Sequence, residues 1–263
     1  TNLASALKNY FDSKNGKRKG DKVGFPKFKS KKNKRQSFRL NNDKIDVADH
    51  ALKVPKLGWV NMAESLRLEG KIMGAVVSRQ AGRWYVSIAV EMEQMERREF
   101  SKPSVGADVG LKTLVVLSDG RQYENQVLLR SELKHLKRLS RRLSRRQQNS
   151  QRWHNAKRQL ERFHGRVANR RADYLHKITT EMTRTYEVIG VEDLNVAGML
   201  KNHRLALSLA DASFGEIRRQ LTYKSRWFGG QVVSVDAFFP SSQLCSTPKC
   251  DGRNSQLTLA ERE

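Results

Sequence analysis

The spacing of apolar residues divides the chain into a strand-rich first part and a mixed second part. Over residues 38–93, short runs alternate apolar and polar positions with period two, most clearly in the run 83–91. Such alternation is typical of half-buried antiparallel strands, and Gln80-Ala81-Gly82 has the length of a hairpin connection. We therefore predict a small antiparallel β-barrel over residues 38–93, preceded by a helix that includes residues 2–11.

Residues 104–240 combine short apolar strands with longer helical patterns. Leucines recur at helical spacing over 129–147, and a second helical pattern follows the break at Gln148-Asn149-Ser150. These two segments predict an antiparallel helical hairpin. Ser213 and Glu216 have the spacing of a capping box, which predicts the start of a later helix. The predicted order is strand, strand, strand, helices, strand, helix, strand, which is the ribonuclease-H-like arrangement of a mixed sheet.

The net charge of the sequence predicts a polyanionic partner. The 263 residues contain 51 Lys and Arg against 27 Asp and Glu, a net charge of +24. A field of that sign favours a nucleic acid. No apolar run is long enough to span a bilayer, and no helix pairs a cationic face with a clean apolar one, so a membrane partner is not expected. The sequence contains no recognisable signal peptide.

Two basic segments are candidates for nucleic-acid binding. The first has phenylalanines among its cations, a pattern that favours backbone contact combined with base stacking. The second is the helical hairpin, where residues 130–171 hold 15 Lys and Arg and two acids. The candidate residues are Lys17, Arg18, Lys19, Lys27, Lys29, Lys31, Lys32 and Arg35 in the first segment, and Arg138, Arg141, Arg142, Arg145 and Arg146 in the second.

Asp108 and Glu192 are the candidate catalytic residues. Asp108 lies within an apolar strand pattern, where an unpaired buried carboxylate is costly, and Glu192 ends a later strand. Carboxylates suit Mg²⁺, and two such ions can promote hydrolysis of a phosphodiester. Spacing alone is equally compatible with Asp108 capping a turn and Glu192 ending its strand in solvent.

Several motifs resemble the TnpB family of bacterial insertion sequences, related to type V CRISPR effectors. They occur in the family's order along nearly the whole chain: residues 23–32, 53–60, 105–111, 190–195, 204–208 and 239–245. The resemblance implies an RNA-guided DNA endonuclease of the prokaryotic cytoplasm, associated with the nucleoid. Its expected partners are a guide RNA from the transposon end and double-stranded target DNA beside a short adjacent motif.

The resemblance also implies a domain plan and site residues. It implies the end of a helical recognition lobe and a basic connector (1–37), a wedge β-barrel (38–93), a linker (94–103), a RuvC nuclease domain (104–240) and part of a zinc ribbon (241–263). Asp108 and Glu192 match the first two RuvC carboxylates, which implies two Mg²⁺ ions. The basic segments would line the positively charged channel for the guide–target duplex.

The sequence departs from the family at two places. The family's third carboxylate follows a second cysteine pair, in a segment beyond Glu263, and neither Asp236 nor Asp251 matches its motif. Cys245 and Cys250 have four residues between them where the family has two, and two thiolates alone do not complete a tetrahedral zinc site. We therefore expect a partial zinc site, and the start at Thr1 suggests an upstream segment.

Three alternatives remain open at this point. The same scaffold could bind DNA under RNA guidance without cleaving it, as a regulator. It could be a transposase that transfers DNA strands on a ribonuclease-H-like core, although no helix-turn-helix pattern is apparent. It could also be a general basic RNA-binding protein, against which a buried Asp108 would count.

Overall fold

The structure is a computed structural model that describes residues 2–27, 36–91, 103–235 and 252. The chain forms two compact units, Thr1–Glu91 and Met92–Glu263. Each is described by itself. Most of the expected linker 94–103, together with Lys29, Lys31, Lys32, Arg35, Cys245 and Cys250, lies outside the described residues.

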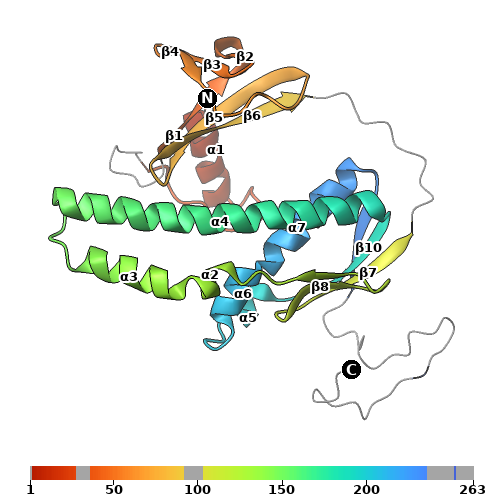
Figure 1. The fold of residues 1–263 in the computed structure, drawn as a ribbon. Helices are drawn as coiled ribbons and strands as arrows, with labels where there is room; N and C mark the ends of the chain where they lie inside the picture. Colours follow the sequence, from red (N-terminus) through yellow and green to blue (C-terminus); the bar gives the residue numbers. More distant parts are fainter. Residues whose placement is uncertain (1, 28–35, 92–102, 236–251, 253–263) are drawn as a thin grey trace. The chain divides into compact units, whose positions relative to one another are not determined.

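The first unit contains one helix and two antiparallel sheets, labelled in Figure 1. The elements are α1 (Asn2–Lys14), β1 (Gln36–Asn41), a 3-10 helix (Asn42–Lys44), β2 (Asp46–Ala48), β3 (Ala51–Val54), β4 (Gly58–Asn61), β5 (Lys71–Gln80) and β6 (Arg83–Glu91). Ala81 and Gly82 both have positive φ, which matches the tight turn expected between β5 and β6. The predicted hairpin is therefore confirmed.

The predicted barrel is wrong for the described residues. The strands form two open sheets of three, ordered β1-β5-β6 and β2-β3-β4. A barrel requires every strand edge to be paired, whereas β2, β3 and β4 are only three or four residues long and pair only with one another. The two sheets nevertheless share one core, built from Leu40, Leu52, Val54 and Ala75 together with Ile45. Period-two alternation predicted the buried faces but not the closure.

The second unit is a mixed α/β structure. Its elements are β7 (Ser104–Val109), β8 (Thr113–Leu117), β9 (Gln122–Glu124), α2 (Leu128–Ser131), α3 (Leu133–Ser144), α4 (Gln151–Thr185), β10 (Val188–Glu192), α5 (Val196–Met199), α6 (Ala206–Ala212), α7 (Phe214–Trp227) and β11 (Gln231–Val235). The sheet order is β11-β10-β7-β8-β9. Strand β10 is parallel to β7 and β11, while β8 and β9 are antiparallel to their neighbours.

Helices cover one face of this sheet. The core joins Val105, Leu114 and Ile189 of the strands to residues of α4, α6 and α7, including Met182 and Ile217. Along β7 the buried residues alternate with exposed ones, so that Ser104, Gly106 and Asp108 lie on the opposite face. That alternation leaves a face of the sheet on which polar side chains are accessible.

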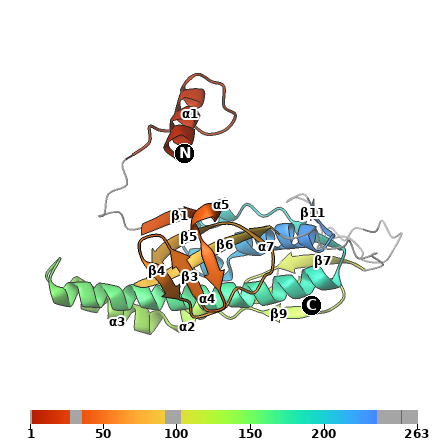
Figure 2. The same cartoon turned by 90° about the horizontal axis from the view of Figure 1, so that it is seen from above.

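Helices α3 and α4 form the predicted antiparallel hairpin, visible in Figure 1 and from above in Figure 2. The Ser150 side chain accepts a hydrogen bond from the Trp153 amide at 3.1 Å and so caps α4. Leucines of α3 pack against Phe163 and Val167 of α4. Among the described residues, no helix is both long and apolar enough to cross a membrane.

Candidate functional site

Asp108 and Glu192 are brought together by the register of two parallel strands. Val188 of β10 pairs with Ser104 of β7, and Val191 pairs with Ala107, so the offset between the strands is constant. The same offset places Glu192 beside Asp108. Paired residues of adjacent strands point to the same face and are separated by about 4.8 Å between backbones. Asp108 and Glu192 are therefore the residues that directly follow the last pair of β7 and β10, on the face that the helices leave open.

Asp108 is exposed, which corrects the prediction that it is buried. Its neighbours Ala107 and Val105 fill the core, and Asp108 points to the other side because successive residues of a strand alternate. Glu192 is partly buried at the end of β10. The argument from the cost of burying a carboxylate therefore does not hold here. What singles out Asp108 is its register with Glu192.

Two glycines leave the sheet without side chains beside the carboxylates. Gly106 and Gly190 are paired across β7 and β10, two residues before Asp108 and Glu192 on the same face. A methyl group added at Gly190 would make only ordinary contacts of 3.8 Å and longer, so packing does not require this glycine. Glycines in paired strands often mark a place where another backbone approaches closely. Neither glycine places a side chain on the face beside the carboxylates.

Gly110 shapes the turn that follows Asp108. A methyl group at Gly110 would lie 2.8 Å from the Thr113 carbonyl oxygen, closer than real side chains come. The Gly110 amide also donates to the Leu114 carbonyl at 3.2 Å. The tight turn into β8 therefore requires glycine at 110 and holds the end of β7 in place.

An arginine of α7 contacts the residue after Glu192. Arg218 forms an ion pair with Asp193 and donates a hydrogen bond to the Ser234 hydroxyl at 2.9 Å. The Asp193 amide donates to the Val235 carbonyl at 3.0 Å. These contacts fasten α7 to the ends of β10 and β11, next to the candidate carboxylates.

The donor set fits a divalent cation only in part. Two adjacent carboxylates are hard oxygen ligands of the kind that Mg²⁺ accepts alongside water and phosphate. Within the described ranges, no group of three or more Asp, Glu, His or Cys residues is arranged to hold a metal ion. The described residues therefore provide two ligands, and a complete two-ion site requires more.

The segment after Glu192 folds into α5 and α6 and is anchored by Asp211. Its carboxylate accepts hydrogen bonds from the Leu129 and Arg130 amides at 2.9 and 3.2 Å, and from the Arg171 guanidinium at 2.7 Å. The Asp211 side chain is 1% exposed. This residue ties α6 to the start of α2 and to α4. Sequence reasoning missed it, although an acid among the apolar residues of 205–212 was a usable signal.

A second missed group is the buried lysine between α4 and α7. The Lys224 ammonium donates to the His176 carbonyl at 2.9 Å and to the Thr179 and Thr180 hydroxyls at 2.8 Å each. The Gln220 side-chain oxygen lies 3.3 Å away. Desolvation by burial, with a smaller effect of the Arg219 charge, lowers the pKa of Lys224 to about 8. The role of Lys224 is therefore in packing rather than in surface binding.

The candidate nucleic-acid residues that the structure describes are exposed. Lys17, Arg18, Lys19 and Lys27 follow α1, and the five arginines of the second segment lie along α3 and just after it. Ion pairs engage few cations of the hairpin: Lys157 with Glu161, Arg170 with Glu132, Arg171 with Asp211, and Lys177 with Asp173. Across residues 103–235, the exposed arginines of α3 have no acidic partner. The hairpin thus presents unneutralised positive charge.

Comparison with protein families gives two matches. Residues 87–203 match a family model described as "Probable transposase", and residues 214–263 match one described as "Cas12f1-like, TNB domain". The chain is 36% identical over 260 residues to the "Putative RNA-guided DNA endonuclease InsQ" of Escherichia coli (strain K12), covering 93% of this chain and 62% of that relative. It is 33% identical over 243 residues to a "Putative RNA-guided DNA endonuclease" of Streptomyces pristinaespiralis, covering 91% and 60%.

A solved structure is similar in fold. It is titled "Cryo-EM structure of the Cas12f1-sgRNA-target DNA complex", and the match has a TM-score of 0.54 at 13% identity. The match covers 97% of this chain and 64% of that one, and at this identity it bears on the fold alone. The chain spans about three fifths of the length of the curated relatives described above.

Proposed function

The chain belongs to the TnpB family, and from that premise we propose that it acts as an RNA-guided DNA endonuclease of an insertion sequence. The observation that carries the proposal is the placement of Asp108 beside Glu192 on the open face of the mixed sheet. The relatives at 36% and 33% identity are named as RNA-guided DNA endonucleases, which supports the activity.

The sheet supports a RuvC-like, ribonuclease-H-like assignment of residues 104–240. Three strands joined by hairpins, β7 to β9, lead through helices to the parallel strands β10 and β11. In this arrangement the two carboxylates lie where parallel strands end, at the edge of the sheet where sites in such sheets are commonly built. Within the first unit, residues 38–91 would form the proposed wedge domain, as two open sheets.

Asp108 and Glu192 would hold divalent cations, with Mg²⁺ as the preferred ion. Bound there, the ions would lower the pKa of an attacking water and stabilise the leaving oxygen of a phosphodiester. The chain's own residues position the reaction. The carboxylates fix the ion site, the paired glycines admit the DNA backbone, and the turn at Gly110 holds β7 in register. The remaining carboxylate would come from outside the described residues, as would Cys245 and Cys250 of the proposed partial zinc site.

Guide RNA and target DNA are the proposed partners. The similar Cas12f1 structure was solved, by its title, with sgRNA and target DNA. In such complexes the guide–target duplex lies in a positively charged channel, and the protein contacts the sugar-phosphate backbone of the duplex. The exposed arginines of α3 and the cations after α1 have the charge for this contact. The origin of the guide at the transposon end and the short adjacent motif belong to the same proposal.

A second candidate function is RNA-guided DNA binding without cleavage. It is favoured by one observation: the described residues contribute only two of the carboxylates that a two-ion nuclease uses. Such a protein would occupy DNA as a regulator. Strand transfer, suggested by the description "Probable transposase", is a third outcome that the same experiment separates.

The test is cleavage by the full-length protein purified with RNA from the transposon end. Matched DNA is supplied with Mg²⁺ or with EDTA. We expect cleavage that requires both RNA and metal and that falls by more than a hundredfold in Asp108→Ala and in Glu192→Ala. The loss should exceed the roughly 10–100-fold cost of removing an outer partner of a metal ligand.

Asp173→Ala is the matched control, because Asp173 is an exposed acid that pairs with Lys177. It should cleave normally. Binding of matched DNA without any cleavage would favour the regulator, and joining of transposon ends without guide RNA would favour a transposase. Metal-independent cleavage would refute the assigned role of the two carboxylates.

A further inference from the structure

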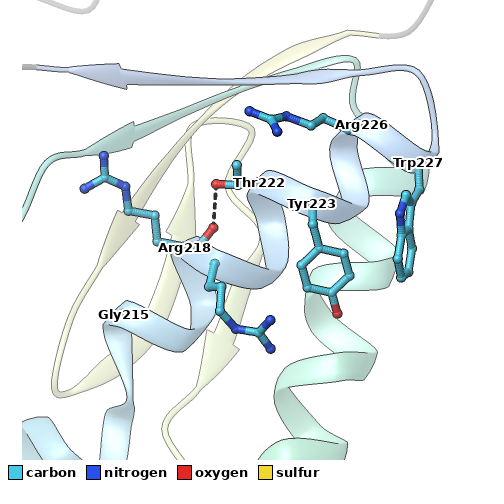
Figure 3. A pocket seen from close by; sticks show the side chains of 7 residues that line it. Gly215, Arg218, Thr222, Tyr223, Arg226 and Trp227 are labelled. Carbon is cyan, nitrogen blue, oxygen red and sulfur yellow. Dashed lines mark hydrogen bonds between the residues drawn. The ribbon is translucent and has the colours of Figure 1, made fainter. Parts of the chain in front are cut away.

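One face of α7 carries arginines and aromatic residues that the core does not use. Arg218, Arg219, Thr222, Tyr223, Arg226 and Trp227 line a surface hollow of about 660 Å³ together with Gly215. We call this set the α7 stripe, and Figure 3 shows its side chains. The opposite face of α7 is buried through Ile217 and Leu221. The stripe is therefore the outward face of a helix whose other face is fully packed.

The aromatic side chains of the α7 stripe are exposed and pack against one another. Trp227 is 64% exposed, and its ring meets that of Tyr223 edge to face with centroids 4.6 Å apart. Figure 3 shows the two rings side by side. The Arg219 guanidinium lies over the Tyr223 ring at 5.3 Å, and two hydrogen bonds to Glu216 hold it there. A large exposed aromatic ring beside a held neighbour is a platform on which an unpaired base can stack.

The charged part of the stripe suits a phosphate backbone. Arg226 is exposed and has no acidic partner among the residues that the structure describes. Arg218 lies about 12 Å from it along the helix, at 1.5 Å per residue. Arginines spaced along a groove beside stacking aromatics are the combination that single-stranded nucleic acids require. A duplex would not fit as well, because its bases are already stacked and paired.

The position of the stripe links it to the candidate nuclease site. Arg218, at one end, contacts Asp193 and Ser234. Asp193 follows Glu192 directly, and Ser234 precedes Val235, the register partner of Glu192. The stripe lies on the helical side of the sheet and the carboxylates on the open side. A strand that follows α7 would therefore reach the carboxylates by passing over the ends of β10 and β11.

We propose that the α7 stripe binds a single-stranded segment of the target DNA beside the nuclease site. A base stacks on Trp227, and Arg226 contacts a phosphate. The identity of the strand rests on the proposed nuclease function, because that function supplies unpaired DNA at this edge of the sheet. The stripe itself rests on the geometry of α7.

The test measures binding apart from cleavage. The full-length protein carries Asp108→Ala and is loaded with guide RNA, and a fluorescent single-stranded oligonucleotide is titrated by anisotropy. Trp227→Ala should weaken binding by about 5- to 150-fold, the effect of losing one base–aromatic stack, and Trp227→Phe should restore most of it. Arg226→Ala should weaken binding and reduce the salt slope by about 0.7, whereas Arg226→Lys should keep the slope.

Controls separate the outcomes. Lys177→Ala removes an exposed, ion-paired cation of α4 and should leave DNA affinity unchanged. Equal DNA affinity in Trp227→Ala and the parent protein would overturn the proposal, and so would a loss confined to guide RNA binding. Thermal unfolding checks that each variant is folded. If the wild-type protein fails to cleave but Trp227→Ala still loses single-stranded DNA binding, the proposed nuclease function fails while the docking surface stands.

Discussion

At the scale of single residues, Asp211 joins α2, α4 and α6 of the second unit through one buried carboxylate. Asp211→Ala removes the acceptor of two backbone amides and leaves the Arg171 guanidinium without its carboxylate. Breaking a buried ion pair on one side typically costs about 3–5 kcal/mol. We expect a loss in the free energy of unfolding near the lower end of this range, since Arg171 is 23% exposed.

Chemical denaturation measures this effect. Asp173→Ala is the control, because the Asp173–Lys177 pair is exposed on both sides and such pairs contribute about 0–1 kcal/mol. Equal stability of the two variants would contradict the assigned role of Asp211. If Asp211 also holds the segment after Glu192, its loss should lower the cleavage rate more than the affinity for guide RNA.

Lys224 predicts a dependence of stability on alkaline pH. Burial lowers its pKa from 10.5 to about 8, so between these values the folded protein binds fewer protons than the unfolded chain. The resulting contribution to stability is fully present above pH 10.5 and is lost as the pH falls to about 8. The free energy of unfolding should therefore rise from pH 8 to 10.5, on the order of 1 kcal/mol after allowance for solvent screening.

The comparison is with Lys224→Met, which has no titrating group at this position. The difference between the two curves of unfolding free energy against pH isolates Lys224 from Arg219, Glu216 and His176 around it. Curves that stay parallel from pH 8 to 10.5 would refute the prediction.

The sequence singled out individual residues where they interrupt a regular pattern of apolar positions. Asp108 stood out as a carboxylate in an apolar strand, but its exposure required knowledge of which face the helices cover. The helix start predicted at Ser213 is confirmed by α7, but the side-chain hydrogen bonds of the capping box are not formed. Ser213 adopts a left-handed conformation, its hydroxyl donates to the Ala210 carbonyl, and Glu216 binds Arg219 instead. Ser213 alone separates α6 from α7, and its hydroxyl bonds back to α6 instead of to the first amides of α7.

At the scale of elements, the α3 surface predicts a salt-dependent contribution to nucleic-acid binding. Changing Arg141, Arg142, Arg145 and Arg146 together to Gln should weaken binding of the guide RNA–DNA complex and flatten its dependence on salt. Removing one cation from a phosphate lowers the slope of log affinity against log salt by about 0.7–0.9. The slope should therefore fall by up to about 3.6, measured by filter binding across salt concentrations.

The matched control removes four positive charges from other exposed positions: Lys44, Lys56, Lys71 and Lys112. It lowers the net charge equally and should change the slope less than the α3 variant. An equal change in both would assign the effect to net charge rather than to the hairpin.

Elements with strong periodicity were predicted well, and closure between elements was not. The leucines of α3 and the cap at Ser150 gave the hairpin, because helical spacing and a local hydrogen bond suffice to define it. The barrel failed because alternation records which side of a strand is buried, whereas closure depends on pairing between strands distant in sequence. The α7 stripe was missed for a similar reason: only the inward residues of that helix follow a recognisable pattern.

At the scale of the whole molecule, charge and motif order carried the functional prediction. A net charge of +24 indicated a nucleic acid but could not distinguish a nuclease from a binding protein. The family motifs favoured a nuclease, and the matches to family models over residues 87–203 and 214–263 agree with the resemblance. The linker and the cysteine segment lie outside the described residues, so those two expectations remain predictions.

The pairing of β7 with β10 determines how far the length of the α3–α4 hairpin can vary. The α3–α4 hairpin lies in the chain between the two strands that hold Asp108 and Glu192. The entropy lost on closing such an insertion grows only with the logarithm of its length, about 0.6 kcal/mol for each doubling. Strand register, rather than the length of the intervening arm, sets the spacing of the carboxylates. The hairpin can therefore be lengthened or shortened while the candidate site keeps its geometry.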